Sequence, residues 1–291
     1  VASETDLDGD AEECATWIAL TLWRLCAQPQ NAASVLAHGG HKLLGLLKLT
    51  LSDSLRRSVI GCFGTLMSWP DLVLPLVEMR VLDELTHIAA SAGESGQRLA
   101  AARVIDALAP QLLGSQCADG RRTSAATSDG TEVARLAKVF VDLLGDRSLS
   151  LRSLACRSLA RTARRGGQRA IVGHSGCDAL VGQLKSAEAL LRGAGREGRA
   201  GAAELLRDAL NAILNLSESK LAQEALAKLG LDVIVRIFSS PPAAALVEEG
   251  HGEHFADQAA EMASLILRNL ASTPSNRTLM SKAELGLKLA A

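Results

Sequence analysis

The sequence contains no tyrosine, and only four phenylalanines and three tryptophans among its 291 residues. A compact two-layer domain of this length normally needs more aromatic side chains to fill a deep centre. Leucine and alanine dominate instead, which favours thin layers of helices that each contact only their neighbours. Hydrophobic residues make up 48% of the chain and charged residues 22%, a balance that excludes a disordered protein.

The six cysteines form no CxxC pair and no cluster, and five of them lie in or beside apolar helical segments. This pattern favours a reducing, intracellular compartment, so we expect a cytoplasmic protein, or an organellar one if the chain is a processed product. No apolar run approaches the ~20 residues of a membrane span, and the N-terminus shows no signal-peptide pattern. Peripheral membrane attachment through sequence upstream of Val1 stays open.

Features of catalysis and of metal or nucleic-acid binding are also missing. No Ser/His/Asp or Cys/His set stands out, so we expect no catalytic residues, no cofactor and no enzymatic activity. The HGEH segment at 251–254 lacks HEXXH spacing and falls in an expected loop, so we expect no metal site. The GAGREGRAG segment at 193–201 follows no strand, which favours a flexible linker over a phosphate-binding loop. The formal net charge of -1 disfavours nucleic acid as a partner.

What the sequence does contain is a repeat of long apolar helices, each closed by a leucine. These leucines are Leu25, Leu66, Leu108, Leu159, Leu216 and Leu270. The first two intervals, 41 and 42 residues, match the ~40–47 residues of a helical repeat unit. The later intervals are longer, and we assign the excess to insertions at 114–131, 191–201 and 239–252. Six units are therefore predicted, near 10–50, 54–90, 95–145, 148–192, 202–240 and 253–291.

Each unit shows the same order of elements. A long amphipathic helix is followed by a polar turn, a short helix that ends at a glycine, and another apolar helix. In the first unit these are WIALTLWRLCAQPQ, NAASVLAHGG and HKLLGLLKL. Gly39 and Gly40 are accordingly expected in a turn, where glycine supplies a left-handed helix cap.

Two segments carry a resemblance to the armadillo repeat family, ALNAILNLSESKLAQEALAKLGLDVIVRIF (209–238) and LILRNLASTPSNRTLMSKAELGLKL (265–289). Both place Asn-Leu at the end of the long helix and then a short helix that leads to a glycine. Segments 17–47 and 154–184 fit the same frame. The resemblance implies an all-α, right-handed superhelical solenoid over 1–291 as a single domain of about six units. The third unit is degenerate, because the 114–131 insertion stands in place of its short first helix.

The resemblance further implies that the long helices line a concave groove that holds extended segments of other proteins. In nuclear-import adaptors of this family, Trp and Asn four residues apart bind a basic peptide. No such ladder is present here, so an import receptor is disfavoured and the fold is of a non-importin type. Trp17, Trp23 and Trp69 are expected to be core or cap residues.

A basic strip of seven arginines and no acid runs from Arg147 to Arg169. Arg157, Arg161 and Arg164 are at helical spacing and share one face. Two interpretations stay open, a solvated helix surface and a docking strip for an acidic or phosphorylated segment. For Asn215 and Asn269 the alternatives are a hydrogen bond to a bound peptide and one to a neighbouring layer.

These features favour a non-enzymatic scaffold or adaptor that holds an extended, acidic protein segment in the groove. The expected groove residues are Arg24, Arg103, Arg157, Ser158, Arg161, Arg164, Asn211, Asn215 and Asn269. The alternative is a structural subunit of a large multiprotein assembly, with contacts through the insertions and the open ends. A small-molecule pocket between layers is a third and more distant alternative.

Overall fold

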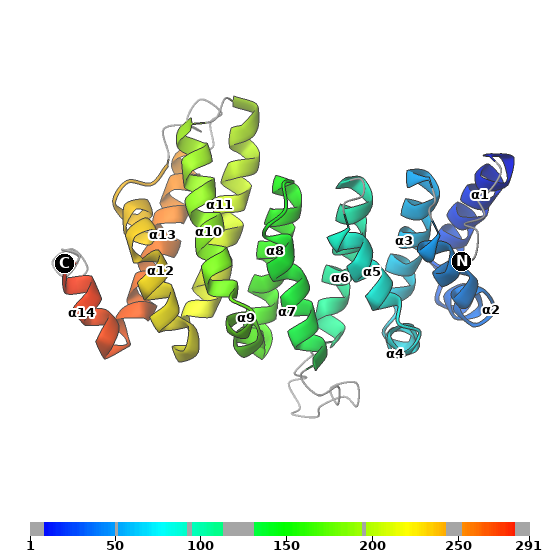
Figure 1. Cartoon of the computed structure of the whole chain (residues 1–291), viewed down its shortest axis with the longest axis horizontal. Helices are drawn as coiled ribbons and strands as arrows, with labels where there is room; N and C mark the ends of the chain where they lie inside the picture. Colours follow the sequence, from blue (N-terminus) through cyan, green and yellow to red (C-terminus); the bar gives the residue numbers. More distant parts are fainter. Residues whose placement is uncertain are drawn as a thin grey trace, which may run out of the picture. The chain divides into compact units, whose positions relative to one another are not determined.

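The computed structural model describes residues 9–49, 52–91, 95–112, 131–193, 196–242 and 252–282. Within these ranges the secondary structure is helical and contains no strand, which confirms the expected all-α class (Figure 1). Contacts divide the chain into two compact units, Val1–Asp129 and Gly130–Ala291. Most of the expected 114–131 insertion lies outside the described residues. The predicted loss of the short helix in the third repeat falls on the same residues. The expected single domain and its unit boundaries stay predictions.

The first unit is built from two packed layers. The long helices α1, α3 and α6 lie side by side in one layer, while α2 and α5 form the other and α4 connects to both α3 and α5. Leu55, Phe63 and Leu66 of α3 are fully buried between the layers. The helices of this unit are α1 Gly9–Leu25, α2 Pro29–Lys48, α3 Asp53–Met67, α4 Pro70–Glu78, α5 Val81–Ala90 and α6 Ser95–Leu112.

The second unit repeats this arrangement. One layer contains α8, α11 and α13, and the other contains α7, α10 and α12. A π-helical turn, Ala163–Gly167, joins α8 to the short helix α9, with Gly166 at a φ of 89° where an L side chain would be strained. The helices are α7 Thr131–Leu143, α8 Leu149–Thr162, α9 Gln168–Gly173, α10 Gly176–Gly193, α11 Arg196–Ser217, α12 Lys220–Ser239, α13 Gly252–Ala271 and α14 Pro274–Lys282.

The helix starts follow from local sequence. Pro29, Pro70 and Pro274 each occupy the first position of a helix, where the missing N–H leaves no hydrogen bond unmade. Ser52 caps α3, because its side chain accepts a hydrogen bond from the Leu55 N–H at 3.4 Å. Three of the helix boundaries are thus encoded by proline and one by a serine cap.

The expected turn at Gly39 and Gly40 was wrong, because α2 continues through both glycines as one helix. Gly40 serves close packing instead, since a Cβ there would lie 2.9 Å from Leu36 Cδ1 and 3.0 Å from Met79 Cε. Gly230 plays the same part inside the continuous α12, where a Cβ would lie 2.9 Å from Val181 Cγ2. In the predicted repeats 10–50 and 202–240, the expected short helix and the apolar helix after it therefore form one continuous helix.

The flexible linker expected at 193–201 was also wrong. Helix α10 extends to Gly193 and α11 begins at Arg196, so nearly all of the segment is helical. The two helices pack against each other, and the additional residues lengthen this pair. At Gly201 a Cβ would lie 3.2 Å from Leu149 Cδ1, which ties the start of α11 to α8. His254 likewise lies within α13 rather than in the expected loop, whereas His251 lies outside the described residues.

The prediction that the tryptophans are core or cap residues agrees with the structure in part. Trp69 is the residue before α4 and its Nε1 donates a hydrogen bond to the Cys26 carbonyl at 3.0 Å, as expected of a cap. Trp17 and Trp23, both expected in the core or a cap, are 64% and 40% exposed on α1. None of the described helices has the length and apolar character that a membrane span requires.

Candidate functional site

The α8–α11–α13 layer carries most of the polar residues singled out from the sequence. Arg157 and Arg161 lie on α8, and Arg164 lies in the π-helical turn directly after it. Asn211 and Asn215 lie on α11, four residues apart, so both face the same side of that helix. Because α8 and the turn after it pack against α11, Arg157 and Arg164 contact side chains of that helix.

Arg164, Asn211 and Asn215 form one hydrogen-bonded cluster. Arg164 Nε donates to Asn215 Oδ1 at 3.1 Å, and Arg164 Nη2 donates to Asn211 Oδ1 at 3.2 Å. Asn215 is buried and its Nδ2 donates to the Ala160 carbonyl at 3.4 Å, while Arg164 is exposed. The guanidinium is thus held in one orientation by two neutral amide oxygens. Across the described residues, no carboxylate forms an ion pair with it.

Arg157 has the opposite environment. Its Nη1 lies 3.5 Å from Glu204 Oε1, and its Nε lies 3.4 Å from Asp208 Oδ2, an ion pair without hydrogen-bond geometry. Asp208 is buried and accepts a short hydrogen bond from Ser153. Burial raises the pKa of the Asp208 carboxyl above its usual range, against the opposing effects of Ser153 and Arg157. The positive charge of Arg157 is therefore used to hold α8 against α11.

Two further expected groove residues make contacts within the protein. Ser158 is fully buried and its Oγ donates to the Leu154 carbonyl at 2.8 Å, which does not support a contact with a partner. Asn269 of α13 donates from Nδ2 to Ser217 Oγ at 2.9 Å. For Asn269 this geometry favours the neighbouring-layer alternative over the bound peptide.

Arg24 and Arg103 belong to the first unit, on α1 and α6, and both are exposed. The seven other expected residues belong to the second unit. The candidate site is built from residues of the second unit.

The sequence interpretation did not single out the two carboxylates of this layer that pair with Arg157. Glu204 and Asp208 lie four residues apart on α11, a spacing that by itself places two carboxylates on one face of a helix. It also missed Gln223 of α12, whose buried amide donates to the Ser217 carbonyl at 2.8 Å and accepts from Ser272 at 3.3 Å. Within the described ranges, no cluster of His, Cys, Asp or Glu has the arrangement of a metal site.

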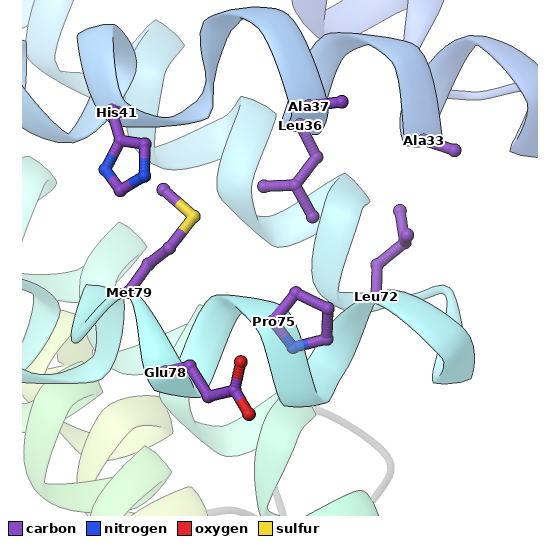
Figure 2. Close-up of a pocket in the computed structure, with 8 residues that line it drawn as sticks. All are labelled: Ala33, Leu36, Ala37, His41, Leu72, Pro75, Glu78 and Met79. Atoms are coloured by element: carbon purple, nitrogen blue, oxygen red, sulfur yellow. The ribbon is translucent and has the colours of Figure 1, made fainter.

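A second surface feature lies in the first unit, between α2 and α4. It is an open groove of about 580 Å³, and Figure 2 shows His41 and Met79 facing each other across its left side. The lining residues are Ala33, Leu36, Ala37, His41, Leu72, Pro75, Glu78 and Met79.

No family model and no curated protein matches the sequence. Solved structures do match in fold. An engineered protein aligns with a TM-score of 0.59 and 19% identity, covering 90% of this chain and 94% of its own. A designed armadillo repeat protein in complex with the peptide (KR)4 aligns with a TM-score of 0.58 and 15% identity, covering 89% and 95%. A structure of computationally designed armadillo repeat proteins for modular peptide recognition aligns with a TM-score of 0.58 and 16% identity. The alignment covers 88% of this chain and 94% of that one. The fold of this chain is that of an armadillo repeat solenoid.

Proposed function

We propose that this protein is a non-enzymatic scaffold that binds an extended, acidic segment of another protein along α8, α11 and α13. The observation that carries the proposal is the cluster of Arg164, Asn211 and Asn215. A guanidinium held by neutral acceptors keeps its full charge for a partner carboxylate or phosphate. Its orientation is already fixed before binding, which lowers the entropy cost of the contact.

The asparagines add hydrogen-bonding capacity beside this charge. Asn211 is half-buried and uses its Oδ1 as an acceptor for Arg164 and, at 3.5 Å, for Asn215. In the part of the chain that the structure describes, Asn211 Nδ2 has no acceptor. An amide donor next to a fixed positive charge suits an extended peptide that offers main-chain carbonyls and acidic side chains.

The similar structures support a peptide as the class of partner. One of them is a designed armadillo repeat protein in complex with a peptide, and that peptide, (KR)4, is basic. The charge in the turn after α8 favours the opposite sign here, because Arg164 has an exposed guanidinium that no described carboxylate neutralises. Opposite charges across an interface steer association and reject partners of the wrong sign.

Fluorescence anisotropy with labelled peptides tests the proposal. The peptides are an extended Asp/Glu-rich sequence, a phosphoserine version of it, and (KR)4 as the opposite-charge comparison. We expect the acidic peptides to bind and Arg164→Glu to weaken binding by roughly tenfold or more, as for the loss of a charge-assisted hydrogen bond. Arg169→Glu on α9 is the matched control, since it changes the net charge equally at another exposed arginine.

Two outcomes would reject the acidic segment as the partner. One is tighter binding of (KR)4 than of either acidic peptide. The other is an equal loss of affinity in the Arg169→Glu and Arg164→Glu variants, which would show that only net charge matters. The affinity of the wild type should also fall as salt rises, because exposed charges are screened over about 10 Å at 0.1 M ionic strength.

A structural subunit of a larger assembly is the second candidate function. Exposed apolar residues on α1 favour it, with Trp17 at 64% and Ile18 at 60% exposure. Sedimentation velocity on the isolated chain separates the two functions. A stable monomer supports the scaffold, whereas concentration-dependent association that Trp17→Ser abolishes supports the subunit.

A further inference from the structure

We propose that Cys26 and Cys62 form an intramolecular disulfide that fastens the end of α1 to the middle of α3. The two Sγ atoms are 3.7 Å apart, and both cysteines are fully buried. A disulfide has an S–S length of roughly 2.0 Å, so the sulfur atoms need to approach by only about 1.7 Å. This modification is independent of the proposed peptide-binding face, which lies in the other unit.

The backbone on both sides of the sulfur pair is held in place by tryptophan side chains. Cys26 follows directly after α1, and its carbonyl accepts the hydrogen bond of Trp69 Nε1 at 3.0 Å. Next to Cys62, Gly61 lies so close to the Trp23 ring that a Cβ would be 2.7 Å from Trp23 Cε2. Trp23 Nε1 donates in turn to Thr65 Oγ1 at 2.9 Å. These contacts join α1, α3 and the start of α4, and they keep the two thiols facing each other.

The other described cysteines have no such arrangement. Cys14 is exposed on α1. Cys156 and Cys177 are buried, and burial raises the pKa of both thiols, that of Cys177 to about 11. Within the described ranges, neither has another sulfur atom at hydrogen-bonding distance. These three cysteines therefore serve as internal references for selective oxidation.

The two thiols differ in pKa. The hydrogen bond from the Cys62 thiol lowers the pKa of Cys26, and the same bond, together with burial, raises the pKa of Cys62. The geometry lets either sulfur act as the nucleophile and the product is the same disulfide; the lowered pKa favours Cys26. Because both are buried, an oxidant has to be small and has to enter through a local opening of the unit.

Hydrogen peroxide meets this requirement and supplies the two oxidising equivalents. The Cys26 thiolate attacks one peroxide oxygen, the O–O bond breaks, and the departing hydroxide takes up the proton that the thiol released and leaves as water, so that a sulfenic acid remains on Cys26. The Cys62 sulfur then attacks the Cys26 sulfur, the S–O bond breaks, and a second water leaves with the Cys62 proton. In total, two thiols and one peroxide give one disulfide and two waters.

The cross-link spans 36 sequence positions and restricts the unfolded chain, so it should stabilise the first unit. The test uses the whole chain, treated with hydrogen peroxide and then with iodoacetamide, before non-reducing digestion by trypsin. Cleavage after Arg24, Lys42, Arg57 and Arg80 places Cys26 in peptide 25–42 and Cys62 in peptide 58–80, each as its one cysteine. We expect these two peptides to be recovered as a joined pair whose mass is lower than their sum by two hydrogen atoms.

A Cys14→Ser variant is the control that should give the same joined pair, whereas Cys62→Ser should leave peptide 25–42 without its partner. Circular dichroism checks that both variants fold. The oxidised protein should also unfold at a higher temperature than the same protein reduced with dithiothreitol. The proposal is overturned if peptides 25–42 and 58–80 stay alkylated when Cys14 is already oxidised, or if Cys26 joins to peptide 1–24 instead. A joined pair with no rise in the melting temperature would overturn its fastening role.

Discussion

Arg236 of α12 holds the Glu188 carboxylate of α10 with two of its nitrogens, Nε to Oε1 at 3.3 Å and Nη2 to Oε2 at 3.1 Å. Arg192, one turn after Glu188, adds a third contact at 2.9 Å. The Glu188 side chain is only 6% exposed, whereas both arginines are about half exposed. A bidentate pair of this kind fixes geometry as well as charge, so it ties the α10 and α12 helices of successive repeats together.

Glu188→Gln should destabilise the second unit, because it leaves two guanidinium groups facing a neutral amide. We expect a loss of about 1–2 kcal/mol in the free energy of unfolding, between the values for exposed and buried ion pairs. Urea denaturation followed by circular dichroism measures it. Asp232→Asn is the control, since Asp232 also pairs with Arg236 but is 57% exposed, and it should cost less than about 0.5 kcal/mol. Equal losses in both variants would contradict this assignment.

Asp208 should make the stability of the second unit depend on pH. Burial raises its folded-state pKa above the unfolded value, so the folded state binds the proton more tightly. The contribution of this group is therefore most favourable at low pH, and it is lost as pH rises from the usual Asp value of about 3.9 through the folded-state pKa. Asp208→Asn should reduce this decline in urea-unfolding free energy across that window. Glu204→Gln, at a half-exposed partner of Arg157, should leave it largely unchanged.

Gly230→Ala should destabilise the protein although alanine is the better helix former. The new Cβ would lie 2.9 Å from the buried, β-branched Val181, and overpacking of this kind costs about 1 kcal/mol or more beyond the helix-propensity gain. Gly182→Ala is the control in a helix interior, because Gly182 is exposed and no neighbouring atom lies within 4 Å of its Cβ position. That variant should stabilise by up to about 1 kcal/mol. Thermal melts of both variants test the contrast, and stabilisation by both would exclude the packing explanation.

Gln223→Ala should loosen the end of the described chain. The Gln223 amide oxygen accepts hydrogen bonds from Ser272 and Thr273, and its backbone carbonyl accepts from Asn276 at 3.2 Å. Without the amide, the α13–α14 turn loses two hydrogen bonds to a single acceptor, while the apolar packing of α12 stays. Hydrogen exchange should become faster over 272–282 and stay unchanged in α8. Lys228→Ala, at an exposed position further along α12, should leave the exchange of 272–282 near the wild-type rate.

The leucine repeat predicted the helices well, since Leu66, Leu108, Leu159, Leu216 and Leu270 are all fully buried. Leu25 is the exception at 44% exposure, at the last position of α1. The repeat worked because the apolar stripe of a helix has a fixed period that does not depend on which helix covers it. The turn predicted from glycines was wrong because sequence alone does not show why a glycine is needed. A turn and a close helix contact both require glycine, and only the neighbouring Met79 or Val181 in the folded chain shows that the contact is the reason here.

Sequence by itself determined the helical class, the repeat and the set of arginines and asparagines on the long helices, because these depend on local periodicity and residue type. Tertiary structure alone decided what each polar residue does. Arg157 and Arg164 follow each other at helical spacing, yet one faces the carboxylates of Glu204 and Asp208 and the other the amides of Asn211 and Asn215. The charge left for a partner therefore depends on residues about fifty positions further along the chain, which only the packing of α8 on α11 brings within hydrogen-bonding distance.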